Sequence, residues 1–145
     1  MRLVLTAAAL AVLFVAPPVT ASGRAAPGFA ASPSTPLPPF VDHTQWGQWA
    51  GLPSLRVFPT PSGRLAARQD PTGPSADEAW GEVLALSPDA DSPGMRAQFL
   101  CHWQFAELVQ PGKVSWNLEP WRPVVDDAEM VASGCNPGAP EEAFR

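Results

Sequence analysis

The chain has 145 residues, and 14 acidic against 9 basic residues give it a formal net charge of −5. It has a single lysine, Lys113, and so lacks the clustered basic side chains that binding to nucleic acid requires; we exclude nucleic acid as a partner. Anionic lipid surfaces repel a chain of this charge, so we also expect no steering to membranes.

Residues 1–21 have the pattern of a secretory signal peptide. Arg2 precedes a short apolar run, and the small residues Val19 and Ala21 stand where a signal peptidase reads the chain before Ser22. Two prolines close the run before it reaches the length of a membrane-spanning helix, and no later stretch is long enough to span a bilayer. We therefore expect a secreted protein, extracellular or in the cell envelope, with no membrane insertion after cleavage.

Composition divides the rest of the chain into three parts. Residues 22–40 are rich in proline, alanine and serine and show no apolar period, which is typical of a disordered linker. Residues 41–138 carry periodic patterns and are numerous enough to bury one modest core, so we predict a compact secreted domain there. Residues 139–145 are predicted to be a flexible tail.

The domain is predicted to begin with strands. Residues 41–47 alternate as a strand does, and residues 54–60, SLRVFPT, form a second strand candidate. Residues 61–63, Pro-Ser-Gly, indicate a turn. Residues 64–67, RLAA, are predicted to return as a short third strand, which gives a small antiparallel sheet or hairpin.

A helix is predicted over residues 75–86. Ser75 can cap its free amides, and Glu78 three residues later completes a capping box. At 100° per residue the apolar side chains share one face and the acidic ones point away from it. The apolar face consists of Ala76, Trp80, Val83 and Leu84, and the outward residues are Glu78, Gly81 and Glu82.

A second main helix is predicted from Pro93 to about Val109, with Ser92 as its N-cap. Two polar residues, Gln98 and His102, lie one turn apart within its apolar face. That face holds Met95, Phe99, Trp103 and Ala106, whereas Arg96, Gln104 and Glu107 are predicted to face solvent. A short third helix is expected to begin near residues 126–127 and to end at Gly134.

Cys101 and Cys135 are predicted to form a disulfide, because an even number of cysteines in an exported chain favours pairing. A zinc site is the alternative. However, Cys101 and His102 are adjacent, the chain has no C-x-x-C pair, and His43 is far away in sequence, so the spacing does not favour zinc. We expect no metal and no cofactor.

The segment SWNLEPWRP, residues 115–123, is predicted to be extended, because Glu119 and Arg122 each precede a proline. Trp116 and Leu118 then share one face of a strand, and Asn117 and Glu119 share the other. We expect the second pair to meet two polar residues of the long helix, Gln98 and His102.

This polar cluster has three interpretations. It is a structural hydrogen-bond network, with an ion pair from Arg122 to Glu119 or Asp126; a pocket in which His102 and Glu119 act as a general acid–base couple; or a site that binds a ligand without chemistry. The first interpretation is favoured, because buried polar residues are more often structural than catalytic.

The chain has six tryptophans and no tyrosine. Trp80, Trp103 and Trp116 are predicted to lie in the core. Trp46, Trp49 and Trp121 either pack in the core as well or form an exposed aromatic platform for a ligand. The candidate binding residues are therefore Trp46, Trp49, Gln98, Asn117, Trp121 and Arg122.

Several motifs together resemble a family of small secreted actinobacterial proteins known as a domain of unknown function. The motifs are WGQW, LRVFPTPSGR, PDADSPGMRAQFLCHW, KVSWNLEPWRP and CNPG, and the similarity extends over residues 41–138. The resemblance implies secretion and a compact domain, and it brings no activity, cofactor or catalytic residue with it.

We predict an α+β fold: a short N-terminal antiparallel sheet or hairpin packed on two main helices and a short third helix, with one disulfide. The favoured function is a binding or interaction module for an unidentified protein, peptide or glycan at or beyond the cell envelope. One alternative is a small secreted hydrolase that uses His102 and Glu119, although the chain has no G-x-S-x-G or H-E-x-x-H motif. The other is a secreted effector or toxin-like factor.

Overall fold

The computed structural model describes residues 35–141. The predicted signal peptide (1–21), the first part of the predicted linker (22–34) and residues 142–145 lie outside the described residues. Within the described part, no helix has the length and apolar character needed to cross a membrane. The elements follow in the order β1 (Val41–Trp49), β2 (Leu52–Pro59), α1 (Pro61–Gln69), α2 (Pro74–Leu86), η1 (Pro88–Ala90), α3 (Met95–Val109), β3 (Trp116–Leu118) and α4 (Asp127–Ala132).

The three strands form one antiparallel sheet in the order β1-β2-β3. Ala50 and Gly51 join β1 to β2 with φ angles of 50° and 81°, and two positive φ values at the centre of a hairpin match the right-handed twist of its strands. The short β3 pairs with β2, with Leu118 beside Leu55. The predicted antiparallel sheet is therefore confirmed, and β3 is one of its edges.

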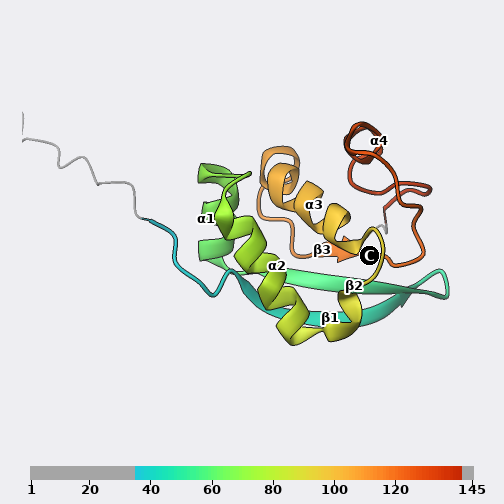
Figure 1. Ribbon diagram of the computed structural model, residues 1–145, viewed down its shortest axis with the longest axis horizontal. Helices are drawn as coiled ribbons and strands as arrows, with labels where there is room; N and C mark the ends of the chain where they lie inside the picture. Colours follow the sequence, from blue (N-terminus) through green and yellow to red (C-terminus); the bar gives the residue numbers. More distant parts are fainter. Residues whose placement is uncertain (1–34, 142–145) are drawn as a thin grey trace, which may run out of the picture. The chain divides into compact units, whose positions relative to one another are not determined.

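Helices α1, α2 and α3 lie together against the sheet (Figure 1). The core fills the space between them, because alternate residues of β2 and β3 turn toward the apolar faces of the helices. Its largest fully buried members are Trp103, Trp116, Phe40, Phe99, Leu55, Met95 and Leu118. Together with Cys101 and Cys135, which are bonded to each other, this arrangement confirms the predicted α+β domain with one disulfide.

The prediction of a third strand at residues 64–67 is wrong, because these residues belong to helix α1. Thr60 caps this helix by accepting a hydrogen bond from the Gly63 amide at 2.9 Å, and Pro61 occupies its first turn. A Cβ atom on Gly63 would lie 2.2 Å from the Phe40 carbonyl oxygen. The glycine that indicated a turn therefore allows the helix to approach the chain before β1.

The predicted caps of the two main helices are also wrong. Helix α2 begins after Gly73, with no side-chain cap from Ser75, and α3 begins after Gly94, whose φ of 84° is left-handed. Glycine adopts this conformation without the steric cost that a residue with a Cβ atom would meet at position 94. Helix α4 begins as predicted, because the Asp126 carboxylate accepts a hydrogen bond from the Glu129 amide at 2.9 Å.

Two glutamates predicted to face solvent instead have partners. Glu107 is only 5% exposed and forms ion pairs with Arg64 and Arg68 of α1, the second at 2.8 Å. Glu82 of α2 accepts hydrogen bonds from the backbone amides of Phe40 and Val41 at 2.8 and 2.6 Å. Both side chains therefore fix neighbouring segments against the helices.

Candidate functional site

Gln98 and His102 of α3 satisfy the free backbone edge of the segment that contains β3. The Gln98 side chain forms two hydrogen bonds with the backbone of Glu119, at 2.9 and 3.0 Å, and His102 Nε2 lies 3.1 Å from the Asn117 carbonyl oxygen. Two residues along a strand rise by about 6.8 Å and four along a helix by about 6 Å, so the two spacings match. The predicted meeting of these residues occurs, but through backbone groups of the strand segment.

Glu119 and Arg122 form a buried ion pair, and their other hydrogen bonds join them to neighbouring segments of the domain. One carboxylate oxygen of Glu119 accepts from Ser54 Oγ at 2.9 Å, and the other accepts from Arg122 Nε at 2.5 Å. The Arg122 guanidinium also donates to the carbonyl oxygens of Pro137 and Ala139, at 3.2 and 2.6 Å. The pair therefore connects β2 to the C-terminal segment.

The geometry does not bring His102 and Glu119 together as an acid–base couple. Within the described residues no hydrogen bond joins their side chains, and each already has structural partners. The neighbouring Asn117 side chain accepts from Ser115 Oγ at 2.8 Å, while its Nδ2 atom is buried and has no hydrogen-bond partner in the described part of the chain.

The three tryptophans predicted to lie in the core do so, and the three whose place was left open lie nearer the surface. Trp80, Trp103 and Trp116 are buried, whereas Trp46 is 38% exposed. The rings of Trp49 and Trp121 lie 6.0 Å apart and are half-buried. The Arg122 guanidinium lies 4.7 Å from the centre of the Trp121 ring, and the indole of Trp121 donates to the Pro53 carbonyl at 3.0 Å. These two rings therefore cover the buried ion pair.

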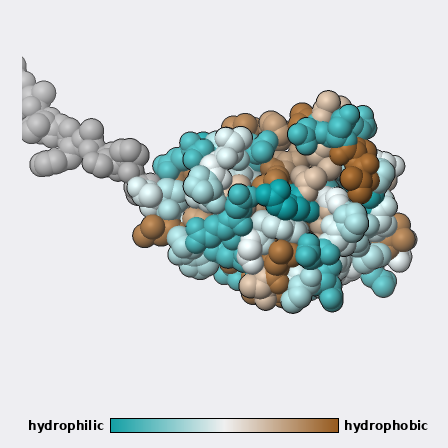
Figure 2. Space-filling view, in the orientation of Figure 1, coloured by the Kyte–Doolittle hydropathy of each residue, from teal (hydrophilic) through white to brown (hydrophobic). Residues whose placement is uncertain are grey.

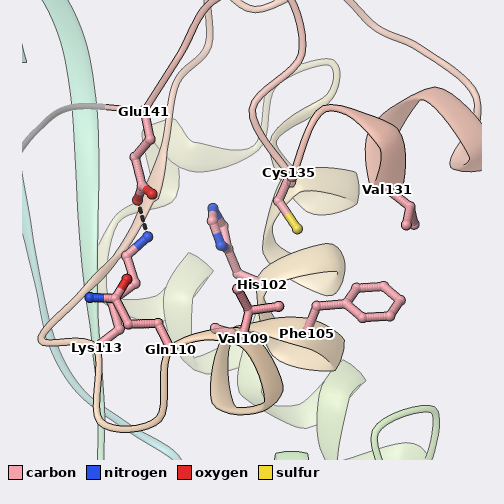
Figure 3. Close-up of a pocket in the computed structure, with 10 residues that line it drawn as sticks. His102, Phe105, Val109, Gln110, Lys113, Val131, Cys135 and Glu141 are labelled. Carbon is pink, nitrogen blue, oxygen red and sulfur yellow. Dashed lines mark hydrogen bonds and ion pairs between the residues drawn. The ribbon is translucent and has the colours of Figure 1, made fainter.

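A pocket of about 190 Å³ opens where the end of α3, helix α4 and the C-terminal segment meet (Figure 3). Its apolar wall comes from both helices, and its polar groups come from α3, the loop that follows α3, and the C-terminal segment. The main apolar residues are Phe105, Ala106, Val109 and Val131, and the polar ones are His102, Gln110, Lys113 and Glu141.

Lys113 contributes a buried ammonium group to this pocket. Its side chain is 6% exposed, and its Nζ atom forms an ion pair with Glu141 of the C-terminal segment (Figure 3). Burial lowers the pKa of Lys113 to about 8, although the charge of Glu119 opposes the shift. Arg64 of α1 positions the loop by donating to the Lys113 carbonyl oxygen at 2.6 Å.

His102 presents a neutral ring to the same pocket. Burial, with a smaller contribution from the nearby charge of Lys113, lowers the pKa of His102 to about 3. We assign the proton to Nε2, because that atom bonds the Asn117 carbonyl, and Nδ1 then carries a lone pair. Of the residues that the sequence singled out, His102 lines this pocket, whereas Lys113 and Glu141, which also line it, were not among the candidates, since no local motif marks them.

We expect His102 to stay neutral between pH 5 and 8, so its ring protons should not shift in NMR spectra over that range. The exposed His43 gives the reference signal, and a His43→Gln variant assigns the two. Because the folded pKa lies below the unfolded value of 6.5, the contribution of His102 to stability is complete above pH 6.5 and is lost as the pH falls toward 3.

The same shift predicts a difference in acid stability. From pH 6.5 to pH 5 the free energy of unfolding should fall by about 2 kcal/mol more in the wild type than in a His102→Gln variant, at roughly 1.4 kcal/mol per pH unit. Urea unfolding at the two pH values measures this difference. Equal losses in both proteins, or a His102 signal that titrates near neutral pH, would contradict the assignment.

The mouth of the pocket is apolar. Val109 is 82% exposed and Val131 is 49% exposed, and both line the opening. Figure 2 shows apolar surface interrupting polar surface on the side of the molecule where α4 and the C-terminal segment lie. An apolar rim around two buried polar groups is the usual composition of a small-ligand site. In the part of the chain that the structure describes, no group of three His, Cys, Asp or Glu residues could hold a metal ion.

Comparisons with known proteins give a family and several relatives. The family model described as "Protein of unknown function (DUF2599)" matches residues 41–138, which confirms the resemblance found in the motifs. The chain is 61% identical over 129 residues to the uncharacterized protein Rv0477 of Mycobacterium tuberculosis (strain ATCC 25618 / H37Rv), covering 89% of this chain and 85% of the relative.

The uncharacterized protein Mb0487 of Mycobacterium bovis matches with the same identity and coverage. The uncharacterized protein ML2452 of Mycobacterium leprae is 58% identical over 112 residues, covering 76% of this chain and 90% of the relative. No solved structure matches the chain significantly.

Proposed function

We propose that this chain, which belongs to the DUF2599 family of proteins of unknown function, is a binding module that acts outside the cytoplasm and holds a small ligand in the pocket between α3, α4 and the C-terminal segment. Export is inferred from the N-terminal sequence, with its single Arg2 and short apolar run. The observation that carries the binding function is the apolar-rimmed pocket with buried Lys113 and His102 at its base.

Binding is a better proposal than hydrolysis because the candidate catalytic groups are already engaged. Both carboxylate oxygens of Glu119 accept hydrogen bonds, and the Nε2 proton of His102 is donated to a backbone carbonyl. Nδ1 of His102 keeps a lone pair, but with its pKa lowered to about 3 the ring is a weak base near neutral pH. Glu119, which is held by Ser54 and Arg122, makes no hydrogen bond to that ring in the described part of the chain. The pocket also holds much less than an extended peptide or a glycan chain would fill, so we narrow the expected partner to a small molecule.

Filling the pocket should abolish ligand binding. We expect benzyl alcohol, a neutral apolar probe, to shift the amide signals of residues 105–113 and 131–135 saturably, with a Kd on the order of 1 mM, as weak small ligands do. A Val131→Trp variant places an indole at the mouth and should remove the shifts. A Val114→Trp variant is the control, because Val114 is 65% exposed and does not line the pocket. Shifts that do not saturate, or that persist unchanged in Val131→Trp, would contradict the proposal.

A further inference from the structure

We infer that the ligand of this pocket is a small carboxylic acid with one apolar or aromatic group, and that its carboxylate replaces that of Glu141 on the ammonium group of Lys113. This inference rests on the proposed function, because it assigns the chemistry of the ligand in the same pocket. Three observations carry it: the buried ammonium, the position of its partner, and the size and walls of the cavity.

The ammonium of Lys113 requires an anion at this position. Its side chain is 6% exposed, and a buried charge without a partner costs several kcal/mol. The carboxylate that pairs with it comes from Glu141, which is 31% exposed and belongs to no helix or strand. Exchange of one carboxylate for another keeps the ammonium paired, so a ligand acid can replace Glu141 without leaving a buried charge uncompensated.

Glu141 can leave the pocket without unfolding the domain. The C-terminal segment is held separately by Arg122, which donates to the carbonyl oxygens of Pro137, Ala139 and Pro140. The contact between Glu141 and Lys113 lies beyond that anchor and involves a side chain. Glu141 therefore resembles an internal competitor: it occupies the anion position while the apolar volume beside it stays open (Figure 3).

The cavity limits the apolar group to about one ring or a six-carbon chain. Its volume is about 190 Å³, and an apolar cavity of about 150 Å³ accommodates benzene. Phe105, Val109 and Val131 supply apolar walls for such a group. The neutral ring of His102 leaves Lys113 as the cation of the lining, and no arginine lines the pocket among the described residues. One point charge suits a monocarboxylate better than a phosphate, which is recognised by several donors.

The test compares hexanoate with hexanamide, which has the same chain and no charge. NMR titrations at pH 6.5 should show hexanoate binding at least tenfold more tightly than hexanamide to the wild type. A Lys113→Met variant should bind both equally. A Glu141→Gln variant should bind hexanoate several-fold more tightly than the wild type, because the competing carboxylate is gone. An Asp77→Asn variant, which removes the acid of an exposed ion pair elsewhere, should bind hexanoate as the wild type does.

The wild type alone provides a second readout that needs no variant to fold. Because the pKa of Lys113 is lowered to about 8, the preference for hexanoate over hexanamide should disappear as the pH rises from 7 to 9.5. Equal affinity for both probes at pH 6.5 would overturn the inference and leave the proposed pocket function standing. Absence of binding by either probe would overturn both. Tight hexanoate binding that Glu141→Gln weakens would overturn the replacement of Glu141.

Discussion

A Glu119→Ala variant is expected to lose about 3–5 kcal/mol of the free energy of unfolding, because it leaves the Arg122 guanidinium buried without a counter-charge. The side chains of Arg122 and Glu119 are 0% and 1% exposed, so water cannot compensate for the missing carboxylate. Ser54 Oγ, which donates to the same carboxylate, also loses its acceptor. Urea unfolding followed by tryptophan fluorescence measures the loss.

Two further variants distinguish the loss of stability caused by leaving Arg122 unpaired from the loss that any change to an ion pair would cause. An Asp77→Asn change breaks an exposed ion pair, in which Arg96 and Asp77 are 53% and 71% exposed, and exposed pairs contribute less than about 1 kcal/mol. A double variant, Glu119→Leu with Arg122→Met, removes both buried charges and should recover part of the loss. A Glu119→Ala variant as stable as Asp77→Asn would show that the buried pair does not hold the C-terminal segment in place.

The β3 edge shows how far a sequence pattern reaches. Helical periodicity placed Gln98 and His102 on one face, and strand alternation placed Asn117 and Glu119 together, so their proximity could be predicted. Which atoms form the contacts could not be predicted. Gln98 and His102 bond the backbone of the β3 segment, and that backbone is available to them because β2 pairs with β3 along its other edge. Sheet order depends on non-local pairing, which a local pattern does not contain.

Helix α1 shows a different limit. Thr60 and Pro61 give a helix start signal, but the Gly63 that follows is also typical of a turn. What decides between them is the approach of the Phe40 carbonyl, about 20 residues earlier in the chain. The missed helix had consequences for the site, since Arg64 on α1 pairs with Glu107 and holds the Lys113 carbonyl. Neither Glu107 nor Lys113 could be interpreted correctly without it.

The disulfide agrees with the predicted export of the chain, because disulfides form in oxidising compartments outside the cytoplasm. Cys101 lies on α3 and Cys135 follows α4, with Cα atoms 5.5 Å apart, and Met130 packs beside them. Cys135 also lines the pocket, so the bond fixes the wall that carries Val131. If residues 1–21 direct export and are then cleaved, the protein recovered from the culture filtrate of a mycobacterial host should begin at Ser22 and contain no free thiol. A retained N-terminus or two free thiols would contradict that route.

Removal of the disulfide by a Cys101→Ala, Cys135→Ala double variant is expected to cost about 4 kcal/mol, because a closed loop of this length restricts the unfolded chain. Dithiothreitol should lower the Tm of the wild type and leave that of the double variant unchanged. Cys135 has a left-handed φ of 68°, so glycine in place of the second alanine should recover about 1 kcal/mol. A double variant within 1 kcal/mol of the wild type would show that packing around Met130 holds α4 on α3, and the pocket wall would then not depend on an oxidising compartment.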